Sequence, residues 1–305
     1  MIRRFILPRA TLFSLFLAFA AQTAFSQRLP PAPRLHSGQI LYYRIDFNGI
    51  RNATSESRIV SPRTPEPEII NVSALLQVEI VEAGVSGLRM KTYYSERDVS
   101  PGSAEAAPGM KAQADQLIEV TVSSDGGASQ IRGLDHLSPT QQFAWNDWLG
   151  RFTSPMTFLK RGARVGQKWV SIEPETASSP IASLSWLKKY EYVRNEPCAA
   201  ASASQLCAVV LVRATLRQKS SAKKATPEDY KQRNLSTRGT ASGQNETALY
   251  ISRLTGLLMR SMEDTQQSLD AIIALTDGSN QVRYRLNARS HSEILLLPDS
   301  TPDAH

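Results

Sequence analysis

The cysteine pair offers the most specific chemistry in the sequence. Cys198 and Cys207 are the only cysteines, and they enclose the segment "CAAASASQLC". A redox pair would normally have the spacing Cys-x-x-Cys, and a metal site would need further ligands, which the four histidines do not provide at motif spacing. We therefore predict a disulfide, which would close a loop of about ten residues and contribute roughly 2.5–3 kcal/mol to stability.

Familiar catalytic motifs are absent from the sequence. It contains no Gly-x-Ser-x-Gly nucleophile turn, no His-Glu-x-x-His metal motif and no phosphate-binding loop. His36, His136 and His291 are far apart in the chain, although folding could still bring them together. Strand alternation turns His291 towards a polar face. We predict a protein without catalytic activity, cofactor or metal, and keep a hydrolase of unknown class as a third interpretation.

The stretch from Arg213 to Arg238 is basic, because it contains eight basic residues and only two acidic ones. Such a density of positive charge favours contact with the phosphates of anionic lipid, lipopolysaccharide or glycan, and the alternative is a solvated loop. Tyr230 is its only aromatic residue, so the base stacking of a nucleic-acid groove is not indicated. The candidate contact residues are Lys219, Lys223, Lys224, Lys231 and Arg233.

The segment "SPTQQFAWNDWLGRF" (138–152) differs from its surroundings because it has the pattern of a helix. Ser138 and Gln141 form a capping box, and Pro139 suits the first helical position. Gly150 can end a helix. These signals predict a short helix over Pro139–Leu149.

One face of this predicted helix is strongly aromatic. Trp145, Trp148, Leu149 and Phe152 recur at helical spacing, whereas Phe143 lies off that face. We expect the face to pack on the concave side of a sheet, either as a plug that fills the core or as the wall of an apolar cavity. The candidate cavity residues are Trp145, Trp148, Phe152, Trp169 and Trp186.

Most of the remaining chain alternates apolar and polar residues, which predicts antiparallel strands with one solvated face. The predicted strand segments are 39–47, 71–81, 87–95, 116–132 (with a central turn), 183–193, 206–218, 246–253, 256–275 and 281–297. If segments 183–193 and 206–218 pair, the cysteine loop is their connection. We predict loops at 52–68, 96–115 and 218–243, the last with a short helix capped by Thr226 and opened by Pro227.

The N-terminus has the layout of a secretory signal peptide. Three arginines flank or precede a 12-residue apolar run (10–21), and small residues precede a cleavage site before Gln27. The run is too short to span a membrane. We expect signal cleavage after residue 26 and a soluble mature protein in the periplasm or extracellular space.

These features, followed by "VGQKW" (165–169), resemble secreted bacterial β-rich proteins of unknown function. The pattern is also similar to half-barrel envelope carriers with LolA-like and LppX-like folds, although the chain lacks their lipidation cysteine. The resemblance covers most of the mature chain in pattern, and "GQKW" is its only motif. It implies a curved sheet that wraps a helix around an apolar cavity, and it assigns no catalytic residue.

The sequence thus predicts a mainly β protein with a large curved antiparallel sheet and one short aromatic helix on its concave face. Residues 27–297 would form the β-rich domain, either as one sheet or as two halves (36–133 and 160–297), and 298–305 a disordered tail. The leading hypothesis is a non-catalytic envelope protein that binds lipid or another apolar ligand. The alternative is an envelope scaffold with a packed core that binds a protein partner. We expect no nucleic-acid partner.

Overall fold

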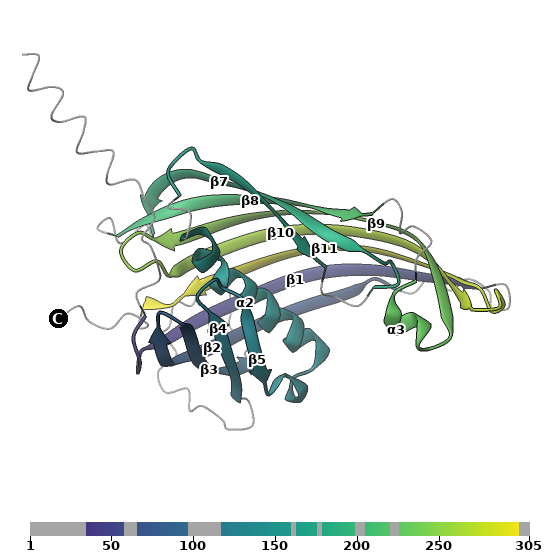
Figure 1. Ribbon diagram of the computed structural model, residues 1–305, viewed down its shortest axis with the longest axis horizontal. Helices are drawn as coiled ribbons and strands as arrows, with labels where there is room; N and C mark the ends of the chain where they lie inside the picture. Colours follow the sequence, from purple (N-terminus) through teal and green to yellow (C-terminus); the bar gives the residue numbers. More distant parts are fainter. Residues whose placement is uncertain are drawn as a thin grey trace, which may run out of the picture.

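The computed structural model describes residues 35–57, 66–96, 117–159, 163–175, 179–198, 205–219 and 226–298. The predicted signal peptide (1–26), its cleavage site, nearly all of the predicted loop 96–115 and nearly all of the predicted tail lie outside these residues. Within the described part, eleven strands form one sheet (Figure 1). The strands are β1 (Ile40–Ser57), β2 (Glu68–Gly84), β3 (Gly87–Glu96), β4 (Leu117–Ser123), β5 (Ala128–Arg132), β6 (Lys168–Pro174), β7 (Leu184–Pro197), β8 (Leu206–Gln218), β9 (Leu235–Ser252), β10 (Leu258–Leu275) and β11 (Val282–Leu296).

The sheet consists of two antiparallel meanders, β1–β5 and β6–β11, which are joined where β1 pairs with β11. Its order is β5-β4-β3-β2-β1-β11-β10-β9-β8-β7-β6, so the first and last strands of the chain are neighbours. They pair from Tyr43 with Leu296 to Ser57 with Val282. The prediction of a large antiparallel sheet is confirmed, and of the two arrangements considered the strands adopt the single continuous sheet.

Period-two alternation determines which face of the sheet is buried. In β1, Leu41, Tyr43 and Ile45 are fully buried, while Tyr42 and Arg44 between them are partly exposed. Antiparallel strands with one apolar face must cover that face with another element. Here the cover is helix α2 (Pro139–Leu159), which lies across one part of the sheet, while β1 and β8–β11 continue past it (Figure 1).

Two predicted loops include residues that belong to strands in the structure. β1 continues to Ser57 inside the predicted loop 52–68, because residues 51–57 pair with β11 although they lack an apolar pattern. β9 likewise begins at Leu235, inside the predicted loop 218–243, where it pairs with the end of β10. Backbone pairing with a long neighbour extends a strand beyond the reach of its own hydrophobic signal.

The predicted aromatic helix is longer than expected. The capping box is confirmed, since Ser138 N donates to Gln141 Oε1 (2.9 Å) and Gln141 N donates to Ser138 Oγ (3.3 Å). Gly150 does not end the helix, which continues through Pro155 to Leu159. Phe152, Met156 and Phe158 extend its buried face, so tertiary packing overrides the local signal to stop.

Two short helical segments complete the fold. A 3-10 turn (η2, Leu134–His136) precedes α2, and helix α3 (Glu228–Lys231) lies in the predicted loop after β8. The predicted helix is therefore present, but its predicted cap is wrong. Pro227 occupies the cap position without a side-chain bond, because the Thr226 hydroxyl accepts from Thr237 N (2.9 Å) on β9 instead.

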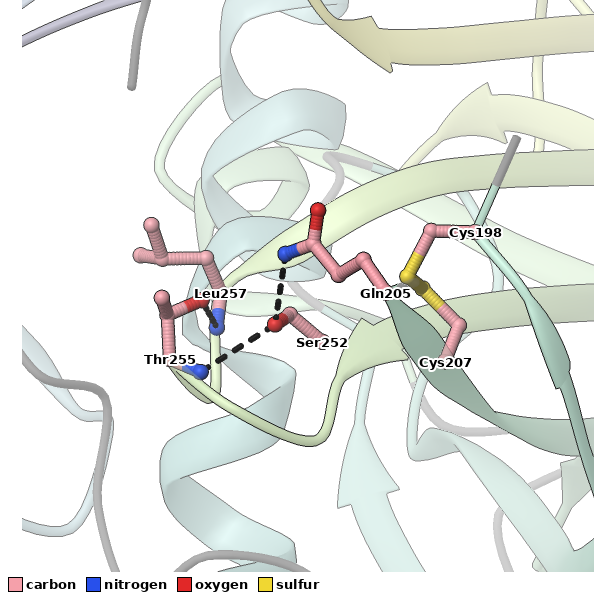
Figure 2. Close-up of a disulfide and its surroundings, with 6 residues drawn as sticks. All are labelled: Cys198, Gln205, Cys207, Ser252, Thr255 and Leu257. Atoms are coloured by element: carbon pink, nitrogen blue, oxygen red, sulfur yellow. Dashed lines mark hydrogen bonds between the residues drawn. A yellow bond between two sulfur atoms is a disulfide. The ribbon is translucent and has the colours of Figure 1, made fainter. Parts of the chain in front are cut away.

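The predicted disulfide is confirmed and connects the ends of β7 and β8, which form the expected hairpin. Figure 2 shows Cys198 and Cys207 beside Gln205, whose side chain reaches the turn between β9 and β10. Gln205 Nε2 donates to Ser252 Oγ (3.1 Å), which also accepts from Thr255 N (3.1 Å). The stapled hairpin is thus tied to the neighbouring turn.

Candidate functional site

The aromatic face of α2 forms the centre of the main core. Trp145 and Trp148 are fully buried, as is nearly all of Phe152, and Trp148 stacks on Phe152 with ring centroids 5.0 Å apart. Trp145 Nε1 donates to Thr92 Oγ1 (3.1 Å) on β3. Phe143 is 55% exposed, as its position off this face predicted. These three candidate cavity residues pack as a plug against the sheet.

Trp169 joins the edge of the same core, as the sequence predicted. It stacks on Tyr190 of β7 (centroids 5.3 Å apart, planes 3° apart), and Phe158 at the end of α2 meets both rings edge-on. Four of the five aromatic candidates are therefore brought together around α2.

Trp186 is placed elsewhere, in a second apolar cluster further along the sheet. It packs with Leu184, Leu216 and Ala271, and its Nε1 donates to Glu175 Oε2 (2.7 Å). A side chain at Gly243 of β9 would approach the indole to 3.0 Å, so the glycine makes room for the ring.

A cavity of about 410 Å³ lies over this second cluster. Its walls come from β1, β7–β11, α3 and the segment before β7, and the five aromatic candidates are not among its lining residues. Trp186 comes nearest, because it packs against Leu184 and Leu216, which do line it. The apolar lining consists of Pro180, Leu184, Leu216, Ala241, Leu269, Ile273 and Leu286, and the polar lining of Arg51, Glu175, Ser179, Tyr230, Ser242, Gln267, Ser268 and Tyr284.

A buried charged network separates the main core from this cavity region. Arg151 of α2 donates to both carboxylate oxygens of Asp147, with Nε–Oδ1 3.2 Å and Nη2–Oδ2 2.6 Å. It also donates to Ser261 Oγ on β10 (3.2 Å) and to Ser292 Oγ on β11. Glu263 Oε1 lies 3.5 Å from Arg151 Nη2. The network anchors α2 to the central strands β10 and β11.

Burial perturbs the acid in this network. Loss of hydration raises the pKa of Asp147 to about 6, against the opposing attraction of Arg151, and the charge of Glu263 adds to the rise. The carboxyl therefore titrates in a mildly acidic range.

The histidines that could have formed a catalytic cluster are all on the surface. His36, His136 and His291 are exposed, and His291 Nδ1 lies 2.8 Å from Asp264 Oδ1 on the solvated face of β10, as alternation predicted. Among the described residues, no three histidine, cysteine, aspartate or glutamate side chains lie close enough together to hold a metal ion.

The basic candidates divide between described and undescribed residues. Lys231 lies on α3, Arg233 follows it and Lys219 follows β8, whereas Lys223 and Lys224 lie outside the described residues. Lys231 Nζ is 3.1 Å from Glu228 Oε2, and both groups are solvent-exposed. Tyr230, on the same short helix, lines the cavity. Of the predicted anionic-contact residues, Lys231 and Arg233 therefore lie close in the chain to a residue of the cavity wall.

The sequence did not predict the polar residues that line the cavity, among them Arg51 and Tyr284. Arg51 has the same parity as Leu41, Tyr43 and Ile45 in β1, so extending that strand by a few residues would have placed it on the inner face. The predicted strand, however, ended at residue 47.

Comparisons with known proteins add little. No family model matches the chain, and no curated protein matches it. Among solved structures, the outer membrane protein OprG from Pseudomonas aeruginosa aligns with 88% of this chain and 98% of its own, at 6% identity and a TM-score of 0.21. Similarity at this level carries no argument about function. Within the described ranges, neither α2 nor any other helix is long and apolar enough to cross a bilayer.

Proposed function

We propose that this chain is an exported, non-catalytic envelope protein that binds an amphipathic ligand in the cavity beyond α2. The observation that carries the proposal is the cavity itself, about 410 Å³ in volume, whose lining surface is mostly apolar although eight polar residues contribute to it. Binding sites for small molecules typically have this size and this mixture of lining groups. The disulfide fits an oxidising compartment.

The location of the site differs from the aromatic cavity expected around α2. Trp145 and Trp148 leave no exposed surface, so the helix favours the plug interpretation. The ligand would instead lie over the second cluster, with Leu216, Ala241 and Leu269 beneath it. Burying hydrocarbon against such a floor is favourable by about 25 cal/mol per Å².

The test uses N-phenyl-1-naphthylamine, a neutral probe that fluoresces in apolar surroundings. We expect the mature chain to bind it, and Ala241→Trp to abolish binding by filling the cavity. Gln244→Trp, which adds the same indole to the exposed face of β9, should bind as the unmodified chain does. Equal binding by both variants would rule out this cavity as the site.

A packed scaffold is the second candidate, and the tight core around α2 favours it. Trp148 lies between Tyr43, Trp145 and Phe152, with centroid distances of 5.8, 6.0 and 5.0 Å. Native mass spectrometry of mature protein from its export compartment separates the two candidates. An added mass that is lost on unfolding and identified as lipid supports the carrier, and a clean apo mass together with absent probe binding supports the scaffold.

A further inference from the structure

The cavity has a cationic end on the β1 side. Arg51 Nη2 donates to the Tyr284 hydroxyl (3.2 Å) across the β1–β11 pair, and both residues line the cavity. Glu68 Oε2 lies 3.8 Å from Arg51, but both side chains are about half exposed, so this ion pair contributes little. The guanidinium retains donors that could bind an anion.

The opposite end of the cavity has a different character. Glu175 and Leu184 line it on the β7 side, and four strands lie between β7 and β1 in the sheet. Five strand spacings correspond to up to about 24 Å along the sheet. The lining residues therefore come from six neighbouring strands, and a chain that lies across these strands would contact the apolar residues of each end.

The two ends also define an orientation. Glu175 Oε2 accepts from Trp186 Nε1 (2.7 Å), so the β7 end presents a carboxylate where the β1 end presents a guanidinium. Arg51 favours an anionic group at the β1 end. Between the two ends, Leu216, Leu269 and Leu286 provide apolar contact.

Helix α3 lies near the cationic end and is close to neutral together with the residues that follow it, because Glu228 and Asp229 balance Lys231 and Arg233. Tyr230 lies within electrostatic reach of both Tyr284 and Arg233. Lys231 pairs with Glu228 (3.1 Å), and the exposed Arg233 follows it. Arg51 is therefore the basic residue that lines this end of the cavity.

We propose that the ligand is a single-chain anionic amphiphile. Its headgroup binds the Arg51 guanidinium and the Tyr284 hydroxyl, and its chain extends over Leu269 and Leu216 towards Leu184. This inference rests on the proposed function and specifies its ligand class.

The experiment measures displacement of bound N-phenyl-1-naphthylamine from the full mature chain. The competitors are dodecanoate and dodecanol, which share one chain length and differ in charge, both used below micelle-forming concentrations. We expect dodecanoate to displace the probe at a concentration at least tenfold lower than dodecanol. In Arg51→Gln this advantage should fall to about twofold or less.

A matched control removes an arginine from the other face of the same sheet. Arg289 is exposed on β11 and pairs with Ile50, next to Arg51, and Arg289→Gln should keep the full preference for dodecanoate. The exposed position of Arg51 means that its substitution should leave the fold intact, which the far-ultraviolet circular dichroism spectrum verifies.

The outcomes separate this inference from the proposed function. If the probe binds but the two competitors are equivalent, or if both glutamine variants weaken the preference equally, the anionic ligand class is overturned and a neutral ligand stands. If the preference survives Arg51→Gln and is lost in Lys231→Gln/Arg233→Gln, the headgroup binds α3, and its assignment to Arg51 is overturned. Failure of the probe to bind overturns the proposed function itself.

Discussion

At the scale of single residues, the two tryptophans of α2 are equally buried but differently bonded. Trp145 Nε1 donates to Thr92 Oγ1, which in turn donates to Ile118 O (3.2 Å). Trp148 Nε1 finds no hydrogen-bond acceptor among the described residues and lies among aromatic rings. The first indole therefore connects α2 to β3 and β4, whereas the second contributes through packing alone.

This difference predicts unequal costs for the same substitution. Trp145→Phe and Trp148→Phe remove similar volume, but only the first breaks a buried hydrogen bond, which contributes about 0.5–1.5 kcal/mol. We expect Trp145→Phe to be the more destabilising by that margin in urea unfolding monitored by circular dichroism. Equal free energies of unfolding for the two variants would contradict this assignment.

Asp147 predicts a pH dependence of stability. Because the folded state binds its proton more tightly than the unfolded chain, whose carboxyl titrates near 3.8, the protonated form favours folding. This contribution is complete below pH 3.8 and is lost as the pH rises to about 6, with a slope of at most about 1.4 kcal/mol per pH unit.

The measurement compares unfolding free energies of the unmodified chain and Asp147→Asn from pH 4 to pH 7. Asparagine does not titrate, so the stability of the unmodified chain relative to the variant should decline from pH 4 to about 6 and then level off. A difference that stays constant, or grows with pH, would show that the folded state does not hold this proton.

Residue type alone could not group the cavity candidates correctly. Trp186 and Tyr192 lie on the same face of β7, yet six residues separate them, which is about 20 Å along a strand. Tyr192 therefore belongs to the main core and Trp186 to the second cluster. Alternation predicts the face of a strand that a side chain occupies, but not its position along a long sheet.

At the scale of elements, local sequence signals predicted where α2 begins better than where it ends. The capping box at Ser138 places the first turn of α2, because its bonds lie within four residues. The helix end at Leu159 depends on Phe158, which packs against Trp169 and Tyr190. These contacts involve β6 and β7, which no local pattern around Gly150 reveals.

The β7–β8 hairpin carries the prediction that belongs to this scale. Opening the disulfide should destabilise the protein by about 2.5–3 kcal/mol, since it releases a loop of about ten residues in the unfolded chain. Cys198→Ala/Cys207→Ala and the reduced unmodified chain should both melt at lower temperature than the oxidised chain. Because the reduced chain retains both thiols, it controls for lost packing at Cys207, which is fully buried. Identical melting of the oxidised and reduced forms would contradict a stabilising role.

At the scale of the whole molecule, the pairing of β1 with β11 decides whether there is one sheet or two. The sequence left this open, because the two strands lie at opposite ends of the described chain and hydrophobic alternation carries no information about such distant partners. The sheet edges are instead the short strands β5 and β6, which expose few unpaired backbone groups.

This arrangement predicts that the two meanders fold only together. Fragments 27–160 and 161–305, produced in one cell, should associate in equal amounts, because β1 and β11 complete each other's hydrogen bonds and α2 packs on β10 as well as on β1. Alone, each fragment exposes a long edge strand, 18 residues in β1 and 15 in β11, and should aggregate. A shortened form of the second fragment, residues 161–281, lacks β11 and should fail to associate with fragment 27–160. Soluble, folded and separate fragments would instead show two independent halves, and the continuous floor that the cavity requires from β1 to β7 would then have no structural basis.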